Sequence, residues 1–382
     1  MKNKPLLAGI LIALVLTGAT ALQIIARDGI RILDINRESP EFAPLPVVPA
    51  ADTDTTGLAV GAARAFISTL AEDDKKKALY DWSSDQKTRW SNLPTPLYQR
   101  RGLRVGDMKP AQRDATMKLL SVVLSKEGYK KVREIMEGDE VLRTSGIGPD
   151  GGPMGQGGGN RPPQGPPGGA PGRLPGGLVF SRDEYFIAVI GTPSLTDPWM
   201  VQFGGHHLAI NLTIAGKSAI MTPSLPAAQP AVYKMNGETV RPLGKENDKS
   251  FALINALNPS QQKKAILNYE IAEVVLGPGQ DGKTIPPEGI KCSELTDKQK
   301  EMVLDLAHEW VGFLNEDAAR VKMAELRKNI DATWFAWSGP TVNGKGAYFR
   351  VQGPTVFIEY SPQRFRGGGL DPNHLHTIYR DP

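Results

Sequence analysis

The spacing of apolar residues alternates between a helical period and a strand period along this 382-residue chain. A helical period holds at about residues 57–136 and again at about 245–328. A period of two holds at about 185–214 and at about 333–380. Grouped helices and grouped strands with hairpin-like spacing predict an α+β fold with a largely antiparallel sheet. We therefore expect a helical N-terminal part and a helical middle block, packed on this sheet in a single large domain.

The first 26 residues predict export from the cytoplasm. Lys2 and Lys4 precede an apolar run over residues 6–22, and Ala19-Thr20-Ala21 fits a cleavage site of small residues. Extended by a few residues, the same run is about 20 residues long, which is enough for an uncleaved membrane anchor. Residues 1–26 are therefore predicted to be a signal peptide or an N-terminal anchor. In both cases the rest of the chain is expected to be periplasmic or extracellular.

Two further stretches have a composition unlike that of a folded domain. Residues 27–55 are rich in proline and acidic residues, which predicts an extended spacer. Residues 146–177 are mostly glycine and proline, and they have too few apolar side chains to repay the entropy of ordering. We interpret them as a disordered insertion, either a tolerated surface loop or a docking segment, within a domain that spans residues 56–382.

Charge and cysteine content exclude several classes of function. The formal net charge is +4 and two of the lysines lie in the predicted export segment, so no nucleic-acid partner is expected. The single cysteine, Cys292, allows neither an intrachain disulfide nor a metal site built on several thiolates. No glycine-rich phosphate loop with its lysine is present, so no nucleotide cofactor is expected. Membrane contact is expected only through the N-terminal segment.

Four of the five histidines lie in two short clusters. His374 and His376 are two apart in a predicted strand, so they should face the same side, about 6.8 Å apart at Cα, and can bind one ion. His206 and His207 are adjacent at the start of another predicted strand. They should face opposite sides, unless the preceding glycine pair distorts them, so only one is expected to join the same centre. All four are candidate metal ligands, and His207 is also a candidate catalytic residue.

Acidic residues offer a fourth ligand for such a centre. Glu359 lies in an otherwise apolar predicted strand, where burying an unpaired carboxylate is costly, so a cation partner is expected. That partner is a metal ion, Arg350 or Arg380. In the first case Glu359 is a ligand or a general base, which makes it a candidate catalytic residue. Asp381 is an alternative fourth ligand.

A centre of nitrogen and oxygen donors admits zinc, copper, iron or manganese. Zinc implies hydrolysis through an activated water, whereas copper or iron implies oxidation. The predicted function is an exported metal-dependent enzyme, with a hydrolase preferred, that acts on an unidentified small-molecule or polymer substrate. Three alternatives stay open. They are a metal-free cleft with a histidine base, purely structural histidines, and a non-catalytic envelope protein that binds a ligand or partner in a histidine-lined cleft.

Four segments together resemble a known protein family. They are residues 203–208 (FGGHHL), 351–354 (VQGP), 358–360 (IEY) and 373–381 (NHLHTIYRD). In this order they are similar to the domain-of-unknown-function family 3500, whose members are mostly bacterial and often exported. The resemblance implies one continuous domain from about Gly57 onward, with the glycine- and proline-rich stretch as an insertion, and it implies no particular activity.

Overall fold

The computed structural model describes residues 25–27, 30–35, 54–145, 177–364 and 368–382. Nearly all of the predicted export segment, most of the predicted spacer and almost the whole predicted insertion lie outside these residues. Two short strands near the N-terminus, β1 (Ile25–Arg27) and β2 (Ile30–Ile35), form an antiparallel pair. Among the described residues, no helix combines the length and apolar character needed to cross a membrane.

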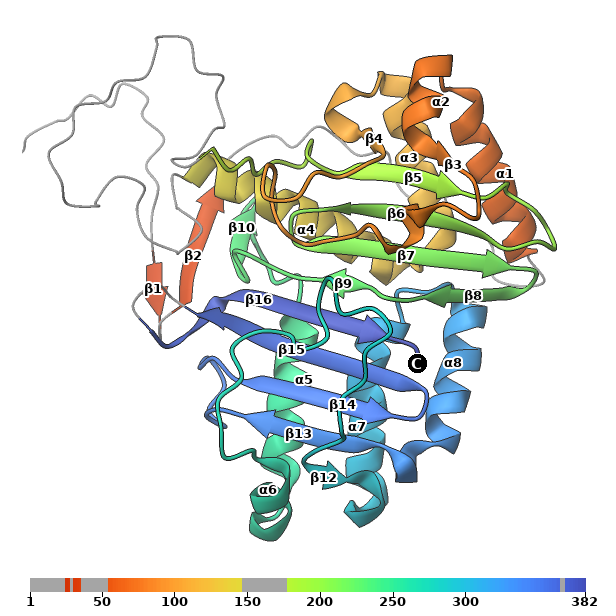
Figure 1. The fold of residues 1–382 in the computed structure, drawn as a ribbon. Coiled ribbons are helices and arrows are strands. Elements are labelled where there is room, and N and C mark those ends of the chain that lie inside the picture. Colours follow the sequence, from red (N-terminus) through yellow and green to blue (C-terminus); the bar gives the residue numbers. More distant parts are fainter. Residues whose placement is uncertain (1–24, 28–29, 36–53, 146–176, 365–367) are drawn as a thin grey trace, which may run out of the picture.

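Two sheets form the centre of the fold (Figure 1). The first has the order β3-β5-β6-β7-β8, with β4 beside β5 and β9 beside β7. Its strands are β3 (Leu79–Tyr80), β4 (Leu103–Arg104), β5 (Phe186–Ile190), β6 (Trp199–Gly205), β7 (Leu208–Ala215), β8 (Ser218–Met221) and β9 (Leu225–Pro226). The second is β12 (Ile290–Lys291), β13 (Trp334–Ser338), β14 (Tyr348–Gly353), β15 (Val356–Arg364) and β16 (Leu370–Arg380), in that order. β3 runs parallel to β5, and the other pairs described in these two sheets are antiparallel.

The segment from Ser224 to Ala228 joins the two sheets edge to edge. It contains β9, which pairs with β7. On its other side, the amides of Ser224 and Ala228 donate to the carbonyls of Tyr379 and Leu375 in β16, each over 2.9 Å. Figure 1 shows the result as one layer of strands from β5 to β13, with the helices on one side and long loops on the other. A third, small sheet has the order β1-β2-β10-β11, with β10 (Tyr233–Met235) between β2 and β11 (Glu238–Val240).

The helices cover one face of this layer and confirm the predicted α+β class. They are α1 (Thr55–Ser68), α2 (Glu72–Ala78), α3 (Pro110–Val123), α4 (Lys126–Ser145), α5 (Gly244–Ala256), α6 (Pro259–Ala265), α7 (Asp297–Val311) and α8 (Glu316–Lys328). Ser125 precedes α4, and its hydroxyl accepts a hydrogen bond from the Gly128 amide, as expected of an N-cap. Thr296 and Gln299 form a capping box at the start of α7. The core lies between helices and strands, where Trp199, Trp310 and Trp337 are fully buried.

The order of elements repeats in two halves of the chain, which the sequence analysis missed. The first half runs from α1 to β8 and the second from α5 to β16. In each half the first helix packs against the third, α1 on α3 and α5 on α7. In each half a two-residue strand before the third helix pairs antiparallel with the first long strand, β4 with β5 and β12 with β13. The chain therefore contains an internal structural duplication.

Two glycines show how closely the halves correspond. Gly102 precedes β4 with a φ of 121°, and Gly289 precedes β12 with a φ of 92°. A side chain on Gly102 would collide with the backbone of Ile187, and one on Gly289 with that of Phe335, each the second residue of its strand. Both positions need glycine for the same two reasons, a left-handed backbone and a close approach to a strand.

The two halves also meet through equivalent residues. Leu124 follows α3 and Leu314 follows α7, and the two form an antiparallel bridge with each other. Gln112 and Gln299, each in the first turn of its helix, donate side-chain hydrogen bonds to carbonyls at the C-terminal ends of α1 and α5. The two halves are therefore related by an approximate two-fold axis, which passes near the Leu124–Leu314 contact.

Candidate metal centre

His206 and His207 form the two-residue turn between β6 and β7. Gly205 pairs with Leu208 across the hairpin, so the strand begins at Leu208 and not at His207. His207 has a φ of 62°, in the left-handed region. The two rings lie on the same side, with centroids 3.5 Å apart. The two rings therefore do not face opposite sides, and the exception expected after the glycine pair applies, because side-chain alternation holds within a strand and not through a left-handed turn.

His374 and His376 project from the same face of β16, as predicted. Their ring centroids are 4.8 Å apart, and their Nε2 atoms are 3.1 Å apart. β16 is the strand of the second sheet that lies beside the segment joining the two sheets, so these side chains are close to the first half of the fold. The period of two therefore places these side chains correctly.

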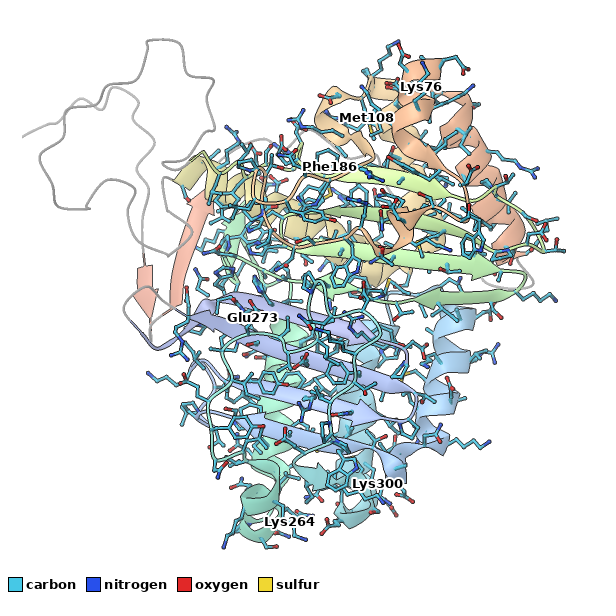
Figure 2. The ribbon with its side chains drawn as sticks, in the orientation of Figure 1. Lys76, Met108, Phe186, Lys264, Glu273 and Lys300 are labelled. Carbon is cyan, nitrogen blue, oxygen red and sulfur yellow. The ribbon has the colours of Figure 1, made fainter. Side chains whose placement is uncertain are left out.

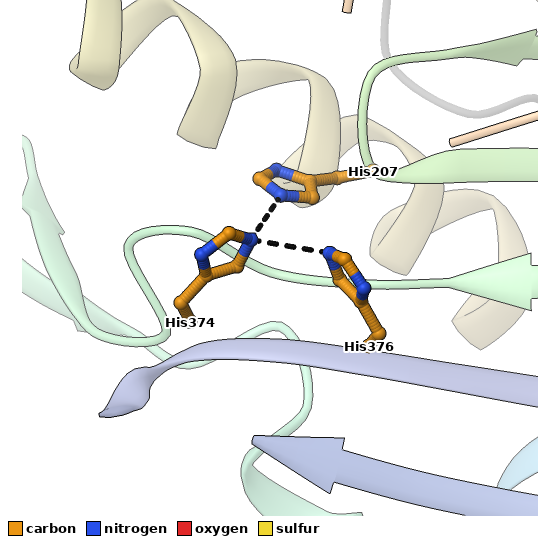
Figure 3. A group of neighbouring side chains, drawn as sticks. All are labelled: His207, His374 and His376. Carbon is orange, nitrogen blue, oxygen red and sulfur yellow. Dashed lines mark hydrogen bonds between the residues drawn. The ribbon is translucent and has the colours of Figure 1, made fainter. Parts of the chain in front are cut away.

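The two clusters meet at one point. The Nε2 atom of His207 lies 3.1 Å from the Nε2 atom of His374, which in turn lies 3.1 Å from that of His376 (Figure 3). His207 and His376 are buried, and His374 is partly exposed. One histidine of the 206–207 pair thus joins His374 and His376, as expected, and it is His207.

This arrangement fits a metal ion. Two nitrogens bound at about 2.1 Å to a tetrahedral ion lie about 3.4 Å apart, close to the spacing seen here. His207, His374 and His376 could hold such an ion, since one ligand atom from each lies within 4.8 Å of the others. Three Nε2 atoms cannot all satisfy one another by hydrogen bonds, because each neutral imidazole carries one N–H. An ion would engage all three lone pairs together.

His207 and His374 are in the protonation state that metal binding needs. Burial, with a contribution from His206, lowers the pKa of His207 to about 3. Burial and the neighbouring His376 hold the pKa of His374 well below its usual value. Both rings are therefore neutral near pH 7, so each offers a free lone pair on one nitrogen.

Two carboxylates lie near the Nδ1 atoms of the histidines, and neither was predicted from the sequence. Glu273 lies next to β16 (Figure 2), with its oxygens 3.1 and 3.2 Å from Nδ1 of His376. Asp139 of α4 is fully buried, and its Oδ1 atom lies 3.5 Å from Nδ1 of His207 and 2.8 Å from Nδ1 of His206. A carboxylate bonded to the outer ring nitrogen fixes the orientation and tautomer of a metal-binding histidine. Glu273 is placed in this way for His376, whereas Asp139 bonds to His206, and Nδ1 of His207 has no hydrogen-bond partner among the described residues.

A family model described as "Protein of unknown function (DUF3500)" matches residues 52–382 of the chain. The chain belongs to this family. No curated protein and no solved structure matches it. The match spans both halves of the fold and both histidine clusters, so this DUF3500 chain carries the whole candidate centre within the family region.

A second group adjoins the first in this DUF3500 chain. Asp139, His206 and His207 also place one ligand atom each within 4.8 Å of one another. The Tyr185 hydroxyl donates to Oδ2 of Asp139 over 2.8 Å, and the His206 ring stacks on Phe180 at 4.5 Å. His206 is thus connected to the three-histidine group by its contacts with Asp139 and His207.

The predicted acidic ligands have other partners. Glu359 accepts hydrogen bonds from the amides of Val275 and Leu276 and from the Tyr348 hydroxyl. None of the hydrogen bonds described for Glu359 involves a histidine, and its role as ligand or base stays a prediction. Asp381 forms an ion pair with Lys322 at 2.6 Å.

Proposed function

We propose that this protein is a metal-dependent enzyme, with a hydrolase preferred, whose ion is held by Nε2 of His207, His374 and His376. The meeting of these three atoms carries the proposal. Three protein ligands leave a fourth position for water or substrate, which is typical of catalytic rather than structural zinc sites. His374 is partly exposed, whereas His207 and His376 are buried, so His374 lies nearest to solvent.

Charge supports a divalent ion. The three imidazoles are neutral ligands, whereas Asp139 and Glu273 bring two negative charges against the outer nitrogens of the rings. A buried carboxylate such as Asp139 is costly without a nearby positive charge. Zinc suits neutral imidazole ligands and supplies an activated water for hydrolysis when bound. Copper or iron at the same nitrogens would supply oxidation chemistry instead.

The chain's own residues have separate tasks in this proposal. Glu273 holds His376 in the tautomer that directs Nε2 to the centre, and the negative charge of Asp139, 3.5 Å from Nδ1 of His207, favours the same tautomer of His207. Glu273 is also half-exposed, with 54% of its side chain accessible, so it can exchange a proton between the site and solvent. The enzyme is proposed to act outside the cytoplasm, on the strength of its N-terminal segment.

Elemental analysis of protein purified without added metal tests this proposal. We expect about one transition-metal ion per chain in the wild type and none in His374→Ala/His376→Ala. His308→Ala is the matched control, because His308 is an exposed histidine on α7 outside the cluster. Equal metal content in the wild type and the double variant would contradict the proposal. Zinc together with metal-dependent cleavage of ester, amide or phosphoester substrates would support a hydrolase, and copper or iron would favour an oxidoreductase.

A further inference from the structure

Asn92 brings a third segment of the chain to the histidines. It lies in the loop between the 3-10 turn at Asp85–Thr88 and β4, and it is 6% exposed. Its Nδ2 atom lies 3.3 Å from Nδ1 and 3.3 Å from Nε2 of His376. The amide nitrogen therefore lies against the His376 ring, equally close to the nitrogen that points to the proposed ion and to the one that faces Glu273.

The backbone around Asn92 is held firmly to the His206–His207 turn. One guanidinium nitrogen of Arg100, Nη2, donates to the carbonyls of Ser91, Leu93 and Gly205 over 2.8, 2.6 and 2.7 Å. Burial lowers the pKa of Arg100 to about 10, so Arg100 still carries its charge at neutral pH. The carbonyl of Asn92 also accepts a hydrogen bond from the His207 amide over 3.4 Å. Asn92 is thus fixed between a clamped loop and a metal ligand.

Metal binding would leave the Asn92 amide without its acceptors on His376. The lone pair of Nε2 would be used by the ion, and the N–H on Nδ1 would donate to Glu273. Neither ring nitrogen could then accept a hydrogen bond from Nδ2. A buried amide N–H without an acceptor is costly, so a site of this kind favours a ligand that supplies one.

We infer that Asn92 is a ligand-binding residue that donates from Nδ2 to an oxygen of a carbonyl or carboxylate bound at the open position of the ion. The inference rests on the proposed function, because it needs the three histidines to hold an ion. A fixed N–H donor beside a metal is placed to stabilise negative charge on such an oxygen. The site is therefore expected to prefer ligands that carry a carbonyl or carboxylate oxygen.

Cobalt(II) and acetate test the inference without a known substrate. The visible absorption of cobalt reports first its binding to metal-free full-length protein, and then the binding of acetate to the cobalt-loaded protein. In Asn92→Ala we expect the cobalt dissociation constant to change by less than about threefold. We expect the acetate dissociation constant to rise about 5- to 30-fold, as for the loss of one hydrogen bond. Asn343→Ala serves as the control, because this exposed asparagine contacts Asn247 and Asp248.

A second variant covers the case in which Asn92→Ala does not fold. Asn92→Asp keeps the shape of the side chain but replaces the donor with a negative charge, so acetate binding should be lost while cobalt remains bound. Acetate affinity equal to wild type in a folded variant overturns the inference and leaves the proposed function intact. A 10-fold or greater loss of cobalt affinity in Asn92→Ala also overturns it, because Asn92 would then support the ion itself. Failure of the wild type to bind cobalt removes the proposed function and this inference together.

Discussion

His207 and His374 belong to different halves of a duplicated fold, and their Nε2 atoms lie 3.1 Å apart. Each half contributes part of the centre, His207 from the first and His374 with His376 from the second. An ion bound here would therefore connect the two halves directly. Its binding energy would add to the free energy of unfolding, because the unfolded chain does not hold the three rings together.

Removing the metal should lower stability. A ligand present at about a hundred times its dissociation constant stabilises the folded state by about 2.7 kcal/mol. We expect a chelator to lower the thermal unfolding temperature of the wild type by several degrees, measured by circular dichroism. The same chelator should not change the unfolding temperature of His374→Ala/His376→Ala. An equal decrease in both proteins would show that the chelator acts elsewhere.

Acid should destabilise the metal-free protein through His207. Its pKa is about 3 in the folded protein and about 6.5 in the unfolded chain. Between these values the unfolded chain binds the extra proton, so stability falls as the pH falls, by about 1.4 kcal/mol per pH unit for this group. We expect the urea midpoint to drop between pH 6.5 and 5, and to drop less in His207→Gln. Identical pH dependence in the two proteins would mean that His207 is not held neutral.

Asp139→Asn should weaken metal binding without abolishing the fold. The variant keeps an oxygen near His206 and His207 but removes the negative charge that favours their Nδ1–H form. Loss of such a carboxylate typically lowers metal affinity about 10- to 100-fold. Competition with a coloured zinc chelator measures this. Glu127→Gln, an exposed change near the start of the same helix, should bind zinc like the wild type. Unchanged affinity in Asp139→Asn would remove Asp139 from the centre.

Glu359→Gln separates a structural role from the predicted role as ligand. The carboxylate of Glu359 accepts from the amides of Val275 and Leu276 at 3.0 and 2.8 Å and from the Tyr348 hydroxyl. A glutamine loses the charge and one acceptor, so we expect a loss of about 1–3 kcal/mol of stability in urea unfolding. The metal content should stay at the wild-type level. If the folded variant loses its metal, Glu359 is a ligand after all.

Local patterns were enough to predict most of the fold. The helical and strand periods located the helical blocks and the strands. The duplication was missed because the halves share spacing and shape more than residue identity. The equivalent segments at 102–105 and 289–292 read Gly-Leu-Arg-Val and Gly-Ile-Lys-Cys, and only the glycine is common to both.

The site was predicted only in part, because local sequence patterns do not show which distant segments meet. The histidines were found because they cluster in sequence, whereas Asp139, Glu273 and Asn92 come from three other segments that only the tertiary structure brings together. Asp139 did leave a signal, since it continues the inward-facing series Val132, Ile135 and Met136 at helical spacing. A carboxylate on the buried stripe of a helix requires a polar partner, and this reasoning could have linked it to the histidines.

The hairpin between β14 and β15 corresponds to the one between β6 and β7, but its tip reads Pro354-Thr355 where the first hairpin has His206-His207. Both tips follow a glycine at the end of the preceding strand, Gly353 in one hairpin and Gly205 in the other. The second tip has no imidazole, and its backbone also differs, because His207 has a φ of 62° whereas neither Pro354 nor Thr355 has a positive φ. Only the first copy of the hairpin thus presents candidate ligands at its tip, and the left-handed backbone at His207 that brings its two rings together has no counterpart in the second copy.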